Sequence, residues 1–234
     1  NNTVMGEPAT LYHVYASGTS MSTPHVAGLA ALVKQYLVET GLIETIYSAL
    51  GKDIPISYLI KDIIVSTASE LGYEPLREGA GVVNASNIVF LANTSRLIIP
   101  HPAKLDMVEF EPIVVGSNIT LINPYNTSLN ITVVPELVLW SGLTYVPDIS
   151  GAITVTPANL TLGPYSSYNV TITVNFTKLP TGYHVLKVYF VDSEGVIVGK
   201  ALVGVSKPGV AMIYGSFAGE PVFLFASVVG YSPI

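Results

Sequence analysis

The stretch Gly18-Thr19-Ser20-Met21-Ser22-Thr23-Pro24-His25-Val26-Ala27-Gly28 joins a glycine turn to a long apolar pattern. Small and apolar residues recur at helical spacing and predict a central buried helix over Ser20–Val38. Pro24 falls in the first turn, where its missing N–H costs little. A serine at such a helix start has an exposed hydroxyl and a free backbone N–H. With a base nearby, this geometry supplies a nucleophile and half of an oxyanion hole.

Spacing alone also fits an ordinary helix N-cap. The complete string, however, resembles the active-site serine signature of the subtilase family at every position: Gly-Thr-Ser-Met-(Ala/Ser)-x-Pro-His-Val-(Ala/Ser)-Gly. Tyr12–Ser17 resembles the strand that delivers this serine, and Gly79–Ala85 resembles the turn near the end of the family's catalytic domain. The resemblance covers about residues 8–92 and implies a serine endopeptidase that forms an acyl-enzyme on Ser20. It also implies that the N–H of Ser20 is an oxyanion donor.

The triad partners implied by this resemblance are expected upstream of Ser20, because subtilases follow the order Asp, His, Ser along the chain. Each histidine here is followed by Val or Pro, whereas the family has His-Gly-Thr; the four are His13, His25, His101 and His184. His25 is expected to pack beside the site without acting as the base. The implied partners are therefore a polypeptide substrate and an upstream part of the same protease that carries Asp and His.

Two further candidates for site residues are set aside on position. Asp192 lies downstream of Ser20 and is followed by Ser193 and Glu194, so a hairpin turn is expected there. The family's oxyanion asparagine is also expected upstream, because Asn1 and Asn2 lie too near the serine.

Residues 1–92 are interpreted as the C-terminal portion of the subtilase parallel-sheet α/β domain. A second helix is predicted over Ile56–Leu71, and a short helix after the glycine turn is predicted to end at Leu91. Because most strands of the family's sheet would lie upstream, residues 1–92 are expected to be unstable alone. A cooperatively folded domain from this segment expressed by itself would contradict that expectation.

Residues 93–103, which contain Pro100-His101-Pro102, are predicted to form a stiff linker. Period-two alternation beyond it predicts an all-β antiparallel sandwich over 104–206. The expected strands are 113–115, 118–122, 130–134, 152–155, 168–176, 183–191 and 196–205. Leu160–Tyr165, Thr171–Val174 and Leu179–His184 loosely resemble the fibronectin-III-like sandwich that follows the catalytic domain in many subtilases. This resemblance implies a role in stability, spacing or docking.

Residues 207–234 are apolar and are interpreted as a β segment, the start of a further domain being one reading. Gly209–Val229 also has the length of a membrane span, but Glu220-Pro221 and several glycines interrupt it. A strand pair is therefore expected, and no membrane span.

The composition favours an extracellular or cell-surface protein. Only 11% of the residues are charged, the net charge is −6 and there is no cysteine. The few basic residues are scattered, which argues against nucleic-acid binding. Asn1–Ala9 lacks the basic and apolar stretches of a signal peptide, so an export signal is expected upstream.

Nine of the twelve asparagines are acceptors for N-glycosylation in Asn-x-Ser/Thr, a pattern of secreted chains. They are Asn1, Asn84, Asn93, Asn118, Asn126, Asn130, Asn159, Asn169 and Asn175. Glycans would supply the solubility that the charge-poor surface lacks; the alternative is that these are unmodified polar strand residues. This composition resembles that of cell-surface proteins of hyperthermophilic archaea, which implies a thermostable protein.

Two other classes of function compete with a protease. A structural cell-surface or surface-layer component would keep a degenerate subtilase portion, and a surface-layer protein could be its partner. A carbohydrate-binding sandwich has little support, because Trp140 is the only tryptophan. No metal site or cofactor is evident; calcium is implied by the family resemblance alone.

Overall fold

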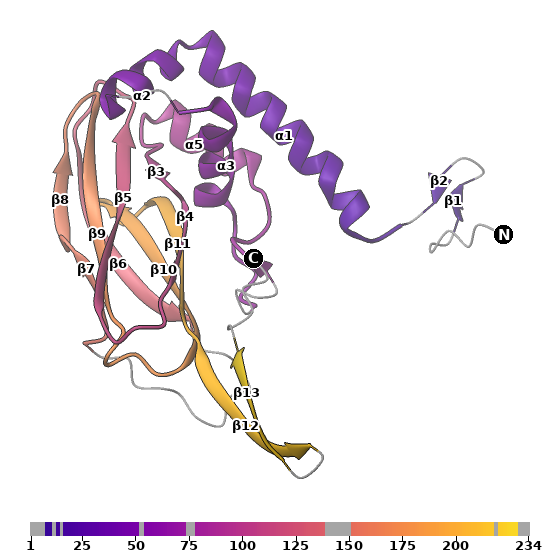
Figure 1. Cartoon of the computed structure of the whole chain (residues 1–234). Coiled ribbons are helices and arrows are strands. Elements are labelled where there is room, and N and C mark those ends of the chain that lie inside the picture. The colour runs from indigo at the N-terminus through magenta and orange to yellow at the C-terminus, as the bar shows by residue number, and fades with distance from the viewer. Residues whose placement is uncertain are drawn as a thin grey trace.

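The change from helical periodicity to strand alternation divides the chain near residue 95. The computed structural model describes residues 8–10, 13–14, 16–51, 54–73, 78–138, 151–217 and 220–228 (Figure 1). Helices occupy the part before residue 94, and two facing sheets form most of the remainder.

The helical part contains one helix that the sequence analysis missed. The helices are α1 (Thr19–Glu39), α2 (Leu42–Leu50), α3 (Ile56–Thr67) and α5 (Ala85–Asn93). Gly41, with φ +68°, ends α1 and leads directly into the unpredicted α2. Helix α3 ends four residues before the predicted Leu71, because Ser69 leaves the helix and pairs with Val82 in an isolated β-bridge.

One strand of a parallel sheet is expected before α1, and the described residues there form no parallel pair. Strands β1 (Pro8–Thr10) and β2 (His13–Val14) form only a two-stranded antiparallel sheet. Of the strand expected over Tyr12–Ser17, Tyr12 and Tyr15 lie outside the described residues. Parallel strands need neighbours joined by long crossover connections, and one strand followed by one helix cannot provide them.

Two sheets form the sandwich. One has the order β4-β11-β10-β6-β8 and the other β3-β5-β9-β7. Their strands are β3 (Ile99–His101), β4 (Lys104–Val108), β5 (Val114–Asn123), β6 (Leu129–Val138), β7 (Ile153–Thr156), β8 (Asn159–Leu162), β9 (Ser166–Asn175), β10 (Gly182–Asp192) and β11 (Ile197–Lys207).

The predicted alternation is confirmed most clearly in β9. Val170, Ile172 and Val174 are fully buried between the sheets, whereas Asn169 is exposed on the outside. One pair departs from the antiparallel prediction. Strand β4 runs parallel to β11, because the chain enters the edge of the second sheet directly after β3.

The segment 93–103, expected to be a linker, contributes to the sandwich. Strand β3 pairs with β5, and Leu97, Ile98 and Ile99 are buried. This apolar run gains more from burial than the neighbouring prolines lose as strand formers.

The helices and the sandwich share one continuous core. Helix α2 contacts β5 and β9, and α3 contacts β3 and β11. Leu37, Ile46 and Leu59 belong to the same buried cluster as Ile119 and Val203 of the two sheets. The division into domains stays a prediction, but no break in the core separates the helical part from the sandwich.

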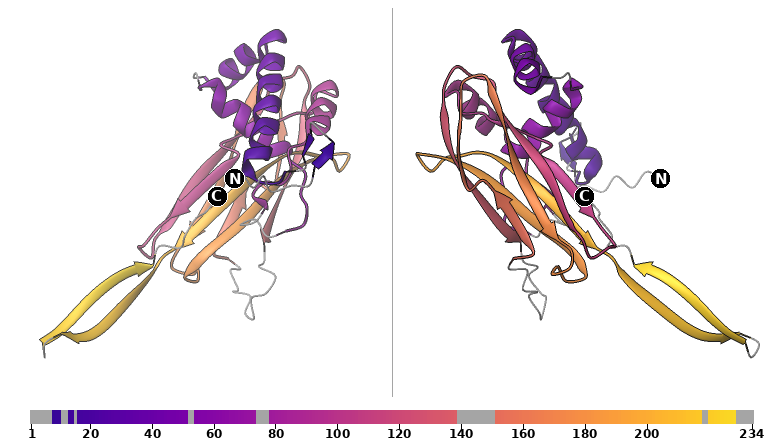
Figure 2. Two further views of the ribbon diagram at one scale, coloured as in Figure 1. Left: turned by 90° about the vertical axis from the view of Figure 1, so that its right-hand side faces the viewer. Right: turned by 60° about the vertical axis from the view of Figure 1, so that its left-hand side comes forward.

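The C-terminal strand pair is confirmed. Strands β12 (Gly209–Phe217) and β13 (Glu220–Val228) form an antiparallel ribbon that extends away from the sandwich in all the views of Figures 1 and 2. Among the described helices, none alone has the length and apolar composition of a membrane span; α1 and α2 together have both, with an 82° bend between them.

The predicted burial of α1 is only half right. Leu29, Val33 and Leu37 are buried, but the first half of the helix stands away from the body, and Leu32 is 61% exposed. Nothing in the described chain packs against that first half, because the helices and sheets that follow lie at its other end (Figure 1).

Leu37→Ala should lower the free energy of unfolding of this chain by about 2–5 kcal/mol, because it empties a fully buried site. Leu32→Ala is the matched control on the same helix and should change it by less than about 0.5 kcal/mol. Urea denaturation followed by circular dichroism measures both. Equal losses in the two variants would contradict this packing of α1.

Candidate functional site

A glycine turn places Ser20 in the first turn of α1. Gly18 has φ +146° and ψ 169°, a conformation open to glycine alone, and it is the N-cap residue. Its carbonyl oxygen accepts from the N–H groups of Met21 at 3.0 Å and Ser22 at 3.2 Å. The N–H of Ser20 therefore has no partner inside the helix, in keeping with the first donors of any helix.

The hydroxyl of Ser20 is exposed to solvent. Its neighbours turn their hydroxyls back onto the helix, because Thr23 Oγ1 donates to the carbonyl oxygen of Thr19 at 2.8 Å and Ser22 Oγ donates to that of Gly18 at 3.4 Å. Among the described residues of the signature, Ser20 and the preceding Thr19 are both exposed, and Ser20 is the one in the nucleophile's place in the family signature. The arrangement offers a nucleophile and one oxyanion donor, but it contains no base.

The described histidine side chains do not meet Ser20. His25 Nδ1 contacts the carbonyl oxygen of Met21 at 2.7 Å, so its ring lies along its own helix. Five residues of helix also rotate His25 by about 140° away from Ser20. His101 pairs with Asp62 of α3, and His184 Nε2 contacts the carbonyl oxygen of Pro180 at 3.0 Å.

Asp192 lies in the hairpin turn between β10 and β11, as the sequence predicted. Its Oδ1 accepts from the N–H groups of Glu194 and Val196, both at 2.9 Å. Its Oδ2 pairs with Arg96 at 3.1 Å, which ties the end of α5 to the sandwich. Both oxygens of the Asp192 carboxylate are therefore engaged in contacts that stabilise the turn and its link to α5.

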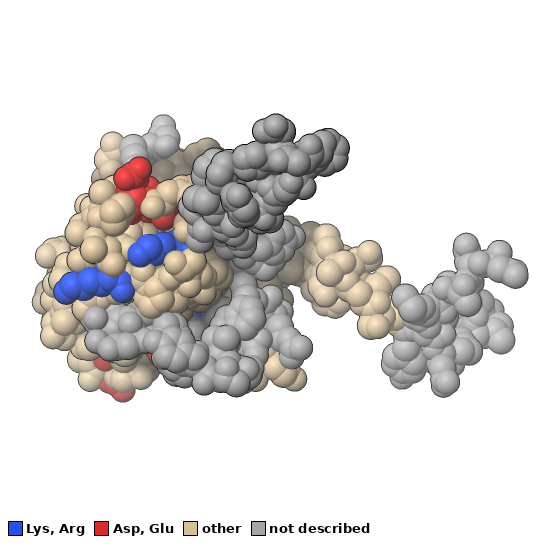
Figure 3. All heavy atoms as spheres, turned by 60° about the horizontal axis from the view of Figure 1, so that its bottom comes forward, with Lys and Arg blue, Asp and Glu red and all other residues tan. Residues whose placement is uncertain are grey.

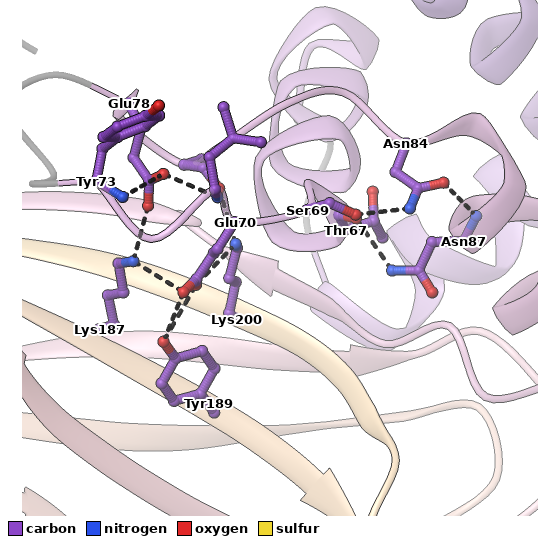
Figure 4. A network of polar contacts seen from close by, with 12 residues as sticks. Thr67, Ser69, Glu70, Tyr73, Glu78, Asn84, Asn87, Lys187, Tyr189 and Lys200 are labelled. Atoms are coloured by element: carbon purple, nitrogen blue, oxygen red, sulfur yellow. Dashed lines mark hydrogen bonds and ion pairs between the residues drawn. The ribbon is translucent and has the colours of Figure 1, made fainter.

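A buried ion network joins the helical part to the sandwich (Figure 4). Lys187 of β10 lies 2.9 Å from Glu70 and 3.2 Å from Glu78, and Lys200 of β11 lies 3.0 Å from Glu70. Both lysines are almost fully buried, at 4% and 3% exposure. Tyr189 of β10 donates to both oxygens of Glu70 at 3.1 Å.

The same network fixes the segment that follows α3. Glu78 Oε2 accepts from the N–H groups of Leu71 at 2.9 Å and Tyr73 at 3.2 Å, and Lys200 donates to the carbonyl oxygen of Ala80 at 2.7 Å. Gly81, with φ +109°, presses against the backbone of Ser69 so closely that a side chain would collide with it. The glycine turn predicted from the sequence is thus fixed by contacts with two strands of the sandwich, β10 through Lys187 and β11 through Lys200.

Burial and the charges of this network together shift the pKa values of its members. Burial alone would raise the pKa of the Glu70 carboxyl, but hydrogen bonds and charge from Lys187 and Lys200 outweigh it and hold the pKa below its usual value. For Glu78, burial is likewise outweighed by the N–H donors and Lys187, which lower the pKa. Burial lowers the pKa of Lys200, and raises that of the Tyr189 hydroxyl beside Glu70 and Glu136.

Two smaller contacts complete the junction. Asp62 Oδ2 lies 2.6 Å from His101 Nδ1, and its Oδ1 accepts from the N–H of Ala103 at 2.9 Å. Tyr36 and Tyr125 join α1 to the connection after β5 through their hydroxyls, 3.1 Å apart.

Within the described ranges, no cluster of three or more His, Cys, Asp or Glu side chains is arranged to hold a metal ion, calcium included.

The sequence analysis missed every member of the ion network. A signal was present: Lys187 and Lys200 each interrupt an otherwise apolar strand whose side chains face a core on both sides. Their partners could not be read from the sequence, because Glu70 and Glu78 lie more than a hundred residues away along the chain.

Comparison with known proteins relates the N-terminal segment of this chain to one protein family. Residues 1–85 match the model of the subtilase family, Peptidase_S8, over a range that includes the whole serine signature. The N-terminal segment is similar to subtilases. Among solved structures, Tripeptidyl Peptidase 2 (TPP II) is 17% identical with a TM-score of 0.48, and the match covers 86% of this chain but 17% of that subtilase-like neighbour's length.

Two other solved structures match a smaller part of the chain. WR4, a C. elegans MSP family member, is 10% identical with a TM-score of 0.33, and the match covers 47% of this chain and 97% of that one. The Class 5 Fimbriae Chaperone CfaA is 17% identical with a TM-score of 0.37, over 57% of this chain and 67% of that one.

The ion network should make the stability of the chain depend on pH. A carboxylate whose pKa is lower in the folded state stabilises that state above its unfolded value, here 4.5, and this stability is lost as the pH falls through the folded pKa. We therefore expect the free energy of unfolding, measured in urea, to decrease as the pH drops below 4.5.

Glu78→Gln should lower the free energy of unfolding at pH 7 by about 3 kcal/mol, because it removes a buried partner of Lys187. It should also flatten the acid dependence. Glu44→Gln is the control, since Glu44 is exposed on α2. A control variant that loses as much stability as Glu78→Gln would contradict the network's role.

Proposed function

We propose that this chain is the serine-bearing portion of a subtilisin-like serine endopeptidase that acts outside the cell or at the cell surface. The observation that carries the proposal is Ser20, exposed on a glycine turn at the start of α1 within a complete subtilase signature. The polypeptide substrate is cleaved through an acyl-enzyme on Ser20.

The reaction uses Asp and His from an upstream part of the same protease. The histidine takes the proton of Ser20 Oγ, which attacks the carbonyl carbon of the scissile peptide bond. The N–H of Ser20 donates to the oxyanion that forms. The leaving amine takes the proton from the histidine, and water then hydrolyses the ester on Ser20 by the same route in reverse.

The uncovered half of α1 supports an upstream partner. In this half, Met21 and Val26 are exposed by 43% and 39% on a helix that has apolar residues on nearly all sides. Such a helix is typical of a buried position. In the proposed protease, the upstream catalytic segment packs around this half of α1 and brings its Asp and His to Ser20.

In the same proposal, residues 1–92 end the catalytic domain and a fibronectin-III-like sandwich follows over 104–206. The ion network of Lys187 and Lys200 supports a stabilising role for that sandwich, because it holds the segment after α3 in place. The ribbon after residue 207 is then the start of a further domain.

A structural surface component is the second candidate, because the described residues place no base near Ser20. The two candidates differ in what lies upstream. A working protease requires an Asp-(Ser/Thr)-Gly and a His-Gly-Thr motif in the preceding sequence, and a surface or surface-layer component does not.

A fluorophosphonate probe tests the protease directly. The protein purified from its source should be labelled, and mass mapping should place the label on the peptide that holds Ser20. Ser20→Ala, with its folding checked by circular dichroism, should abolish labelling. A folded, uninhibited protein that takes no label at Ser20 would contradict the protease and favour the structural component.

A further inference from the structure

Two strand pairs bring Asn-x-Thr tripeptides together in the same crossed arrangement. In the first, Asn118 of β5 lies opposite Thr171 of β9, and Thr120 of β5 lies opposite Asn169 of β9. Thr171 Oγ1 donates to Asn118 Oδ1 at 2.8 Å, and Thr120 Oγ1 donates to Asn169 Oδ1 at 2.8 Å. Each tripeptide thus binds the asparagine of the other with its threonine.

The second pair repeats this arrangement on the other sheet. Asn130 of β6 lies opposite Thr161 of β8, and Thr132 of β6 lies opposite Asn159 of β8. Thr161 Oγ1 donates to Asn130 Oδ1 at 2.9 Å, and Thr132 Oγ1 donates to Asn159 Oδ1 at 3.0 Å. Four of the nine acceptor asparagines are therefore held in crossed pairs.

All four asparagines point outward from the sandwich. They are exposed, while the middle residues of their tripeptides, such as Ile119 and Ile131, are buried between the sheets. Asparagine is unfavourable in strands, so its repeated use there calls for a specific reason. The threonine donors occupy Oδ1 of each amide, so Nδ2 is the amide atom that these contacts leave for a sugar.

We propose that the crossed pairs are anchoring sites for N-linked oligosaccharides, at Asn118 and Asn169 on one outer face and at Asn130 and Asn159 on the other. The donor is an oligosaccharide carried on a lipid phosphate. A bond forms between Nδ2 and C1 of the first sugar, the bond from C1 to the phosphate oxygen breaks, Nδ2 gives up one proton to a base of the transferase, and the lipid phosphate leaves. The linked amide keeps Oδ1 as the acceptor for threonine.

The second pair also has room for a sugar. A hollow of about 450 Å³ lies over Asn130, Thr132, Asn159 and Thr161, and Ser193 lines its side. Hydroxyl and amide groups of this kind suit the hydroxyls of a first sugar. Glycans on both outer faces would also hydrate a surface on which charged side chains are sparse, as the face in Figure 3 illustrates.

Asn84 provides an internal contrast. Its Oδ1 accepts from the N–H of Asn87 at 2.8 Å as the cap of α5, and its Nδ2 donates to Ser69 Oγ at 2.7 Å (Figure 4). A sugar on this Nδ2 would crowd Ser69 and disturb the junction described above. Asn84 is therefore assigned to the structure of the helix start and not to glycosylation, although it lies in the same tripeptide pattern.

Glycopeptide mass spectrometry of the protein from its source tests this assignment, and it does not depend on whether Ser20 is active. We expect oligosaccharide mass on Asn118, Asn130, Asn159 and Asn169, and none on Asn84. Unmodified asparagines in the crossed pairs, or a modified Asn84, would overturn it.

Two variants of Thr120, produced in the source organism, sharpen the test. Thr120→Ser keeps both the acceptor pattern and the hydroxyl donor, so every glycan should remain. Thr120→Val should remove one glycan mass, that on Asn118, and leave the glycan on Asn169, whose own Thr171 is intact. An unchanged glycan mass in Thr120→Val would overturn the proposal.

Discussion

The charges of Lys187 and Lys200 are the constraint on which the arrangement of this chain depends. Each lysine emerges from a strand that is buried on both faces, and an unpaired cation there would cost several kcal/mol. Both find their partners, Glu70 and Glu78, in the segment between α3 and α5. The sandwich is therefore complete only when the helical part lies against it.

The attachment of the helical part to the sandwich determines how α1 is placed for the proposed reaction. One half of α1 is fixed to the body through Leu29, Val33 and Leu37, while the half that begins at Ser20 extends away with its apolar side chains uncovered. The sandwich thus serves as a base from which the serine helix is presented to an upstream catalytic segment. The proposed glycans occupy the outer faces of the sandwich, far along the chain from the uncovered helix.

Local patterns predicted what depends on local sequence. The alternation around Val170 and Ile172 correctly predicted β9, and the glycine turn before Ser20 correctly predicted where α1 begins. Helix α2 was missed because Gly41 was taken as the end of the helical pattern, and strand β3 was missed because Pro100 was read as part of a linker. The ion network and the crossed asparagines depend on pairing between distant strands, and strand register is set by the whole fold.

Calorimetry of the intact chain tests the shared core most directly. If the helices and the sandwich are one cooperative unit, a single transition is expected, with a calorimetric enthalpy equal to the van't Hoff enthalpy. Two separable transitions, the first assigned by circular dichroism to the helices alone, would contradict the account.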